Sequence, residues 1–313
     1  MEKSVKKLVK QIIKKVTRYH RTAGKYIFAN RYKGEENVCI ILAGYKQYVW
    51  KAVFGRVKKF APDNVHVCII SSGLFLDELS EIAEKNNWSY LSTKKNNLCL
   101  AQNIAMLQFP KAEGFFKLDE DMFVTKEFFT NMIETYNRFL EKERYDIGMV
   151  SALTPLNGYG YIRLLEKIGK LHLYEEKFGK AYYSAGVSND RFLMDKNVPI
   201  FMNTIEEFKN IDELSSNLAK DKLTYSICPI RYSIGAIYYK RAIWESMEMY
   251  RVPFGGFGLG QDERDICAYC LCSSKAIVVS ENCAVAHLGY GSHMSNSIKE
   301  YYMSHRELFE IEE

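Results

Sequence analysis

The sequence predicts an α/β protein in which a mostly parallel central sheet is covered by helices on both faces. From residue 37 onward, short continuous apolar runs rich in Val and Ile alternate with stretches of helical spacing. Uninterrupted apolar strands are typical of sheets buried on both faces, and intervening helices provide the crossovers between parallel strands. Glycine, serine or acidic residues follow several of the apolar runs, as expected where strands end at a ligand-binding edge.

The composition agrees with a packed globular chain. Its 313 residues are 47% hydrophobic and 14% aromatic, enough to bury a large core as one elaborate domain or two closely packed ones. No stretch approaches the roughly 18 to 20 apolar residues of a membrane span, and the basic, interrupted beginning does not resemble a signal peptide. We therefore expect a cytoplasmic protein.

Residues 1–34 form a basic leader, with eleven Lys or Arg and a single acid. The leader contributes +10 to a net charge of +5, so the remaining chain carries about −5. Its apolar residues recur at helical spacing and predict an amphipathic helix with a cationic face. They are Val5, Leu8, Val9, Ile12, Ile13 and Val16. Two interpretations remain open: peripheral contact with the anionic inner face of a membrane, or a packed helix with solvated lysines. Nucleic-acid binding is not expected, because the cations are not interleaved with stacking aromatics.

The first half of the remaining chain follows a regular strand and helix order. Strands are expected at residues 37–44, 65–71, 88–92 and from residue 114 to the acidic cluster, and helices at 49–60, from Asp77, at 98–109 and at 126–142. This alternation predicts the parallel part of the sheet.

The second half is less regular. Further strands are expected at residues 145–152, 230–239, 276–280 and 284–287, with a helix at 241–250. Residues 162–226 are polar and irregular, with helical patterns only at 161–173 and 205–218. An insertion of this kind is typical of a variable, substrate-facing region.

Three adjacent carboxylates, Asp119, Glu120 and Asp121, stand at the end of the fourth strand. Because they repel one another, such a cluster at a buried strand end usually requires a cation or a proton. Asp119 and Asp121 share one face of an extended segment and can converge on one Mg²⁺ or Mn²⁺ ion. A solvated acidic turn is the alternative.

A glycine-rich loop, residues 252–260, leads into a helix that begins with Asp262 and Glu263. The loop lacks the Gly-Lys-Ser/Thr ending of a phosphate-binding loop, and acids at the helix start would repel phosphate. We therefore expect it to hold these two carboxylates beside a sugar or hydroxyl. Asp262 as an ordinary helix cap is the alternative.

Two histidines and a tyrosine complete the candidate residues. His287, at the end of a late strand, can complete a metal site begun by Asp121, and His293 is a rival for that role. Tyr159 can stack on a glycan face, although tyrosines also serve ordinary packing.

Together, the strand-ending D-x-D, the glycine-rich loop before an acidic helix start and the late histidine resemble the GT-A class of nucleotide-sugar glycosyltransferases, in particular family-two-like enzymes. The segment G-F-G-L-G-Q-D-E-R-D-I is similar to that of inverting β-1,4-galactosyltransferases, where it supplies the general base. The resemblance covers residues 37–125 and 230–293. The sequence departs from the pattern at Gln261, where the animal enzymes place an acid.

The resemblance implies one continuous GT-A domain, with a nucleotide-sugar-binding half at residues 35–150 and an acceptor-binding, catalytic half at 151–313. Asp262 would be the general base, with Glu263 as its substitute, and Mn²⁺ or Mg²⁺ would bind Asp119, Asp121 and His287. The expected donor-binding residues are Ala43, Gly44, Tyr45, Ser72, Asn103, Asp119 and Glu120. The expected acceptor-binding residues are Tyr159, Gly258 and Gly260.

The implied activity is metal-dependent, inverting transfer of a sugar from a UDP-sugar to a glycan or lipid-linked glycan hydroxyl. A retaining transferase, a sugar-1-phosphate nucleotidyltransferase and a non-catalytic sugar-binding protein are the alternatives. Nucleotidyltransferases open with a glycine-rich, Arg-bearing loop, which residues 42–46 match poorly. A metal nuclease is disfavoured, because the acidic body would repel a nucleic acid.

Overall fold

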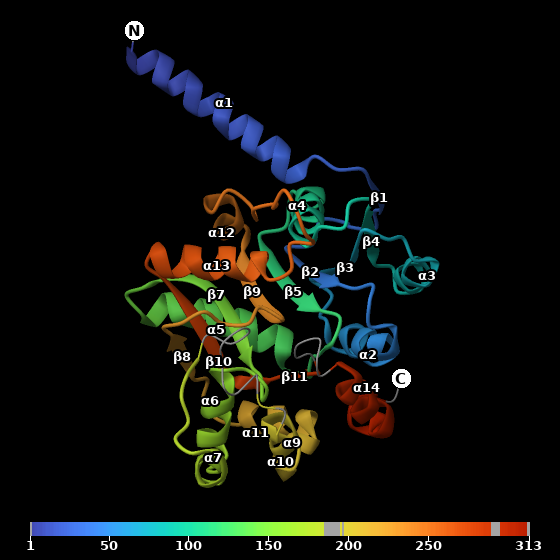
Figure 1. Cartoon of the computed structure of the whole chain (residues 1–313), viewed down its shortest axis with the longest axis vertical. Helices are drawn as coiled ribbons and strands as arrows, with labels where there is room; N and C mark the ends of the chain where they lie inside the picture. The colour runs from blue at the N-terminus through green and yellow to red at the C-terminus, as the bar shows by residue number, and fades with distance from the viewer. Residues whose placement is uncertain (1, 185–194, 196, 289–294, 312–313) are drawn as a thin grey trace.

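The computed structural model describes residues 2–184, 195, 197–288 and 295–311, and a nine-stranded sheet forms its centre (Figure 1). The strand order is β1-β4-β3-β2-β5-β9-β7-β10-β8, and β6 and β11 form a separate two-stranded sheet. The strands are β1 Tyr26–Ala29, β2 Asn37–Leu42, β3 Val65–Ser72, β4 Ser89–Thr93, β5 Gly114–Asp119, β6 Met122–Phe123, β7 Asp146–Leu153, β8 Tyr225–Cys228, β9 Ala236–Lys240, β10 Lys275–Ala284 and β11 Ala286–His287.

Helices cover both faces of this sheet and extend beyond it. They are α1 Glu2–Thr22, α2 Trp50–Phe60, α3 Asp77–Lys85, α4 Leu98–Gln108, α5 Phe128–Lys142, α6 Gly160–Lys167, α7 Leu171–Phe178, α9 Asn197–Met202, α10 Glu206–Lys209, α11 Ile211–Ala219, α12 Arg241–Ser246, α13 Gln261–Cys272 and α14 Ser295–Ser304.

The sheet is mostly parallel. Parallel ladders join β2 to β3 and β5, β3 to β4, and β7 to β10. Strand β9 lies between β5 and β7 and runs against both, and the edge strands β1 and β8 are also antiparallel to their neighbours. The predicted class, a mostly parallel sheet with helices on both faces, is confirmed.

Two apolar cores lie on opposite faces, because successive side chains of a strand point to opposite sides. Along β2, Val38 and Ile40 belong to the core shared with α4, α12 and α13. Cys39 and Ile41 belong to the core shared with α2 and α5. All six positions of β2 are buried, which is why residues 38–42 are continuously apolar rather than alternating.

The structure corrects the predicted boundaries at several points. The helix of the leader ends at Thr22, and residues 26–29 form β1, which belongs to the main sheet. The predicted strand at 230–239 is formed only from Ala236 to Lys240. The two late strands at 276–280 and 284–287 are instead one long strand, β10, followed by the short β11.

The described part of residues 162–226 is mainly helical rather than irregular. Helices α6, α7, α9, α10 and α11 gather below the sheet in Figure 1. A third apolar cluster, which includes Tyr161, Leu165 and Met202, holds α6, α7 and α9 together. These helices are short, so their apolar period is difficult to detect in the sequence.

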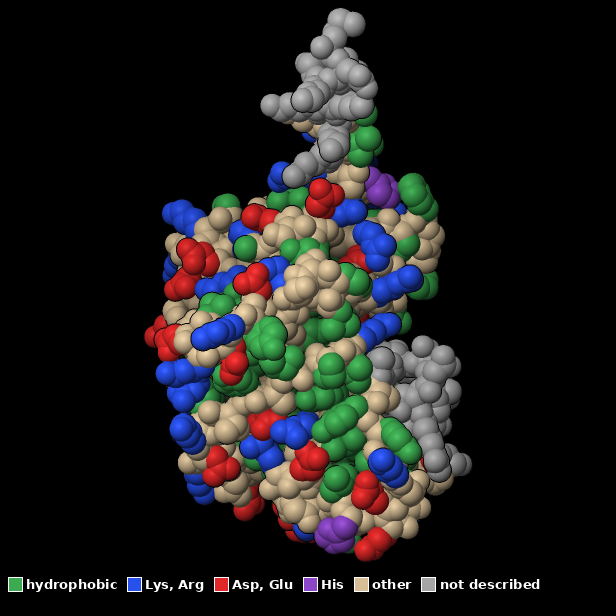
Figure 2. Space-filling view, turned by 90° about the vertical axis from the view of Figure 1, so that its left-hand side faces the viewer, with side chains coloured by type: hydrophobic (Ala, Val, Ile, Leu, Met, Phe, Trp, Pro, Cys, Tyr) green, Lys and Arg blue, Asp and Glu red, His purple; other side chains and the backbone are tan. Residues whose placement is uncertain are grey.

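Helix α1 projects from the body at the other end of the molecule (Figure 1). Among the described helices, none combines the length and the apolar character that crossing a bilayer requires. On the face of the body seen in Figure 2, positive and negative side chains are interspersed, so the basic excess of the chain is not concentrated on that face.

Candidate functional site

The candidate site lies at the edge of the sheet where the parallel strands end. Strand β2 leads to Gly44, β3 to Gly73 and β5 to the acidic cluster, and the pairing of β2 with both neighbours keeps these ends level. Because β9 is reversed, it begins at this edge, and the amide N–H of Asp119 donates to the carbonyl of Gly235 at 2.9 Å. Loops from distant parts of the sequence therefore meet around β5.

Asp121 is buried, with 1% of its surface exposed, and has two cationic or titratable neighbours. The ammonium of Lys46 lies 2.5 Å from its Oδ2, and Nε2 of His287 lies 3.5 Å from the same oxygen. The pairing of β11 with β6 places His287 opposite Met122, next to Asp121. Burial acts to raise the pKa of Asp121, but His287 and Lys46 outweigh it, so the pKa is lowered below its usual value.

Asp119 has a different partner from Asp121. Its carboxylate accepts from the ammonium of Lys117, two residues earlier on the same face of β5, at 2.5 Å. Burial raises the pKa of Asp119, and the negative charges of Asp121 and Asp262 raise it further. Lys117 lowers this pKa, but by less than the other effects raise it. Burial acts to lower the pKa of Lys117, yet the surrounding carboxylates raise it above its usual value. Lys117 therefore remains a cation among acids.

Asp262 and Glu263 stand in the first turn of α13 and are both buried. Oδ2 of Asp262 accepts from Nε2 of Gln102 at 2.9 Å, and Oε1 of Glu263 accepts from Nε of Arg231 at 2.5 Å. Burial raises the pKa of Glu263, although Arg231 acts in the opposite direction. The negative charges of Asp119, Asp262 and Glu263 stabilise the protonated form of Lys117. The first turn of α13 and the end of β5 therefore belong to one charged cluster.

The donor atoms for a divalent cation are only partly assembled. A carboxylate oxygen of Asp121 and an imidazole nitrogen of His287 suit Mn²⁺ or Mg²⁺. Within the described residues, no cluster of three His, Cys, Asp or Glu side chains is arranged to hold a metal. Asp119 is directed to Lys117, and Lys46 holds the position beside Asp121. The rival ligand His293 lies outside the described residues. Asp121 and His287 thus offer two donor atoms suited to a divalent cation, and a cation bound there would have to displace Lys46.

Glu120, a predicted donor-binding residue, contacts the segment between β2 and α2. Its carboxylate turns away from Asp119 and Asp121 and accepts from the backbone N–H groups of Gly44 at 2.9 Å and Tyr45 at 3.1 Å. It also accepts from the indole of Trp50 at 2.7 Å. Glu120 therefore shapes the segment between β2 and α2, because two backbone N–H groups and the buried indole N–H of Trp50 donate to it.

The other predicted donor residues near β2 lie at the expected edge. Ala43 is buried and donates its N–H to the carbonyl of Ile70, whereas the side chain of Tyr45 is exposed and donates to the carbonyl of Ser72 at 3.0 Å. The hydroxyl of Ser72 accepts from the N–H of Asn97 at 2.8 Å. Ser72 thus orders a turn next to the site, and Tyr45 is the exposed side chain of this group.

Asn103, a predicted donor contact, makes its side-chain hydrogen bonds within the fold. Its side chain is fully buried, and it donates to the carbonyls of Arg21 at 3.0 Å and Tyr250 at 2.8 Å. Its oxygen accepts from the indole of Trp244 and the N–H of Tyr250, both at 3.0 Å. Contacts with α1 and with residues 244–250 therefore cover this side chain of α4.

The predicted acceptor residues have packing and backbone roles. Tyr159 is buried and stacks on Tyr183 with ring centroids 4.7 Å apart. Gly258 and Gly260 have φ of +72° and +71°, which side-chain-bearing residues rarely adopt. They let the glycine-rich loop turn into α13, with the carbonyl of Phe257 accepting from Leu98 at 2.8 Å.

Four residues of the charged cluster were not among the predicted site residues. They are Lys46, Gln102, Lys117 and Arg231. The signal for Lys117 was present in the sequence, because a lysine inside an apolar strand requires a buried counter-charge and Asp119 shares its face. Nothing in the sequence indicates the pairings of Lys46, Gln102 and Arg231, because their partners are 32 to 160 residues away.

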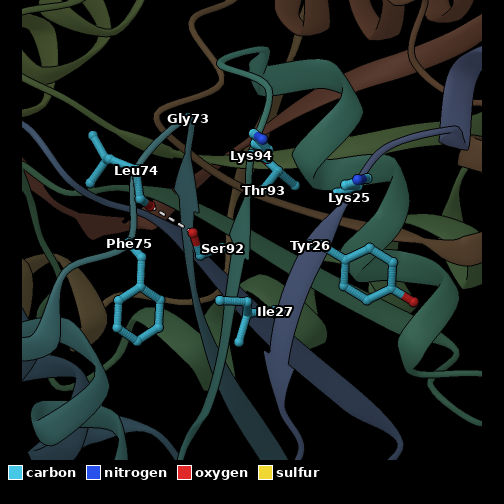
Figure 3. Close-up of a pocket in the computed structure, with 9 residues that line it drawn as sticks. All are labelled: Lys25, Tyr26, Ile27, Gly73, Leu74, Phe75, Ser92, Thr93 and Lys94. Atoms are coloured by element: carbon cyan, nitrogen blue, oxygen red, sulfur yellow. Dashed lines mark hydrogen bonds between the residues drawn. The ribbon is translucent and has the colours of Figure 1, made fainter.

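A cavity of about 350 Å³ lies beside this edge, at the ends of β3 and β4 (Figure 3). Its rim carries Lys25 and Lys94, and the rings of Tyr26 and Phe75 stand on opposite sides of it. Leu74, which lines the cavity, also lies against Gly44, because a Cβ on that glycine would meet it at 3.3 Å. The cavity therefore adjoins the segment that Glu120 holds.

No family model and no curated protein matches the sequence. Similar solved structures include the mannosyltransferase PcManGT from Pyrobaculum calidifontis in complex with GDP-Man and Mn²⁺ (10% identity, 87% of this chain and 62% of that chain covered, TM-score 0.49). A mycobacterial protein (11%, 88% and 75%, TM-score 0.45) and S. aureus TarS 1-349 (10%, 88% and 67%, TM-score 0.45) are also similar. This chain spans less than two thirds of the mannosyltransferase chain. At these identities and TM-scores, the likenesses do not establish an activity.

Proposed function

We propose that this chain is a GT-A-type glycosyltransferase that moves a sugar from a nucleotide-sugar donor to a hydroxyl group. The observation that carries the proposal is the single charged cluster at the carboxyl edge of the sheet. It brings Asp119 and Asp121 at the end of β5 together with His287, and Lys117 couples it to Asp262 on α13. A solvated acidic turn would not be buried and paired in this way.

The cluster offers the two functions that glycosyl transfer requires. Breaking the bond between the sugar and the diphosphate builds negative charge on the leaving group, and the cations near β5 are placed to stabilise it. The attacking hydroxyl is a poor nucleophile at neutral pH, so a carboxylate must accept its proton as the new bond forms. We assign this role to Asp262, with Glu263 as its substitute.

The surroundings of Asp262 support its assignment as the base. It is held by the amide nitrogen of Gln102, and Oε1 of that side chain is buried without a hydrogen-bond partner among the described residues. A buried, unpaired acceptor is costly, and a sugar hydroxyl would satisfy it. With Asp262 and Asp121 on separate elements, base and leaving group are able to take opposite sides of the anomeric carbon, so we propose inversion.

We further propose that Asp121 and His287 hold Mn²⁺ or Mg²⁺, with Asp119 toward the ribose or the cation. When bound, the cation would neutralise charge on the diphosphate. Lys46 must then leave Asp121, and its ammonium becomes available to a phosphate oxygen. The nucleoside end, as in a UDP-sugar, is assigned to the edge near Tyr45 and to the adjoining cavity, where aromatic rings and two lysines suit a nucleotide.

The acceptor is proposed to be a glycan or a lipid-linked glycan at the inner face of a membrane. The basic leader, residues 1–34, supports this choice, because a cationic amphipathic helix suits an anionic surface. We assign acceptor binding to the glycine-rich loop around Gly258 and Gly260, because this loop leads directly to Asp262.

The proposal is tested with purified protein, a panel of nucleotide sugars and Mn²⁺, by following release of the nucleoside diphosphate. Asp262→Asn should lower turnover by about 10²-fold to 10⁴-fold while donor binding is retained, because the base acts only on the acceptor. Asp121→Asn should weaken metal-dependent donor binding itself. Asp63→Asn, at an exposed turn, is the matched control and should behave as the wild type.

Full turnover by Asp262→Asn would contradict the assignment of this residue as the base. Donor binding that is unchanged by EDTA and by Asp121→Asn would contradict the proposed role of the metal. In the second case, Lys46→Met decides whether the lysine neutralises the diphosphate instead, because binding should then be lost. The anomeric configuration of the product separates inversion from retention. Absence of donor binding across the panel would contradict glycosyl transfer as a whole.

A further inference from the structure

The glycine-rich loop carries a group of apolar side chains that the charged cluster does not use. Phe254, Phe257 and Leu259 are 94%, 66% and 88% exposed. Isolated exposed apolar residues are normal, but three within six positions at the tip of one loop form a patch that favours a non-aqueous partner. The glycines around them keep this tip free of further side chains.

Helix α1 carries a second exposed apolar surface. Leu8, Ile12 and Val16 are spaced four residues apart and lie in one row along the helix, and more than half of each side chain is exposed. The neighbouring positions that share this face are also exposed: Val9, Ile13 and Tyr19. No element of the described structure covers this face.

The two apolar surfaces are joined at the base of α1. His20 continues the row of Ile12 and Val16 by one more turn, and its ring stacks on Phe254 with centroids 4.6 Å apart. Nε2 of His20 also lies 3.0 Å from the carbonyl of Val252. The apolar face of the helix therefore continues directly onto the glycine-rich loop.

The base of α1 is fixed to the body. Arg21 donates to the carbonyls of Glu248 and Met249, and its own carbonyl accepts from Asn103 at 3.0 Å. Only residues 23–25 separate α1 from β1, which is paired in the main sheet. The end of the helix is therefore held in place relative to the loop.

Charge indicates which partner covers this surface. The leader carries eleven cations and one acid, and the exposed Lys15 and Arg18 lie three residues apart on α1. A second copy of the same cationic helix would be repelled, and a neutral apolar partner would gain nothing from these charges. An apolar stripe flanked by Lys and Arg is the pattern that binds the interface of an anionic bilayer.

We propose that the apolar face of α1 and the tip of the glycine-rich loop form one surface that inserts into the interface of an anionic lipid bilayer. The loop is the new element, because a leader helix alone would tether the protein without orienting it. With both elements inserted, the start of α13 and Asp262 lie next to the lipid surface. Bilayer binding does not rest on the proposed glycosyl transfer, since it needs neither donor nor acceptor.

The test is co-sedimentation of the full chain with phosphatidylcholine vesicles, with and without phosphatidylglycerol, and no substrate. The wild type should bind the anionic vesicles at least about tenfold more tightly, and added salt should weaken the binding. The helix variant Ile12→Ser/Val16→Ser and the loop variant Phe257→Ser/Leu259→Ser should each weaken binding by about tenfold or more. Circular dichroism and thermal melting establish that each variant is folded.

The matched control is Leu140→Ser/Ile200→Ser, which removes two equally exposed apolar side chains from α5 and α9 and should bind as the wild type. Equal binding of the loop variant and the wild type would overturn the role of the loop. Equal binding to neutral and anionic vesicles, or loss of binding in the control, would overturn the proposed surface. A dimer in sedimentation velocity that the helix variant dissociates, with no vesicle binding, would assign the surface to a second copy of the chain.

Discussion

At the scale of single residues, the acidic cluster shows how three adjacent carboxylates coexist. Asp119 is paired with Lys117, Asp121 with Lys46, and Glu120 turns to the opposite side, where it accepts backbone and indole N–H groups. Their mutual repulsion is relieved by three separate sets of donors. The sequence predicted the cluster and the shared face of Asp119 and Asp121, but not the partners.

His66 provides a test of stability against pH at a site remote from the cluster. Its ring is buried on β3, lies 2.8 Å from the hydroxyl of Ser89 and packs against Tyr32 and Phe109. Burial lowers the pKa of His66, although Glu35 acts in the opposite direction. The unfolded chain then binds more protons than the folded one once the pH falls below about 6.5, so His66 lowers the free energy of unfolding on acidification and has no such effect above this range.

Replacement of His66 by Gln, which does not titrate, should reduce the loss of stability between about pH 7.5 and about pH 5.5. Urea unfolding at both pH values measures the difference. The stability of H66Q relative to the wild type should rise as the pH falls, whereas His172→Gln, at an exposed position, should follow the wild type. Parallel pH profiles for H66Q and the wild type would contradict the assignment.

At the scale of elements, the strands found from sequence are those whose two faces are both buried. Strands β2, β3 and β5 have largely apolar runs, broken only at His66 and Lys117 within them, because helices cover them on both sides. Strands β1 and β8 are four-residue edge strands with partly exposed positions, so their sequences are too short to show a clear strand pattern. Their pairing is decided by β4 and β10, which lie far away in sequence.

The contact between β7 and α13 is close enough to test with a single methyl group. A Cβ on Gly148 would lie 2.3 Å from Sγ of Cys270 and 3.2 Å from its Cβ. Gly148→Ala should therefore lower the free energy of unfolding by about 1 to 3 kcal/mol, because this packed interface has no room for the methyl group. Chemical denaturation provides the measurement.

A double variant identifies the cause of that loss. Cys270→Ala removes the sulfur, so Gly148→Ala should cost clearly less in its presence. Gly55→Ala in α2 is the matched control, since its new Cβ would meet nothing within 4 Å and alanine favours the helix. An equal cost of Gly148→Ala with and without Cys270 would show that the clash lies elsewhere.

At the scale of the whole molecule, Arg56 ties the two halves of the chain together. This side chain of α2 is buried, and its guanidinium makes two hydrogen bonds of 2.7 Å to Asp212 of α11. It also donates to the carbonyls of Val124 at 3.1 Å and Phe309 at 2.6 Å. One side chain thus connects α2, α11, the segment after β6 and the C-terminal segment.

Arg56→Met should lower the free energy of unfolding by about 2 to 4 kcal/mol, because the carboxylate and two carbonyls lose their common donor. Asp212→Asn should cost less, since its carboxylate is 37% exposed and the bonds to Val124 and Phe309 remain. Denaturant unfolding measures both. A larger loss for Asp212→Asn than for Arg56→Met would mean that the ion pair, rather than the carbonyl contacts, carries the connection.

The sequence predicted the parallel sheet, the edge that carries the site and the proximity of His287 to Asp121. It could not predict that α1 and residues 244–250 cover Asn103, or that Tyr183 covers Tyr159. Both depend on which distant segments fold over a surface. A local pattern shows that a residue belongs to a helix, but not what that helix lies under.

The reversed direction of β9 has a consequence for how the site is assembled. A strand parallel to β5 and β7 would have its entry at the far edge of the sheet and would need a long return connection. Since β9 runs the other way, the chain arrives at the edge that carries the acidic cluster, where Arg231 pairs with Glu263 and the carbonyl of Gly235 accepts from Asp119. The antiparallel direction of β9 therefore adds the loop before it to this edge of the sheet. Substitutions in that loop can alter the edge without altering the order of the strands.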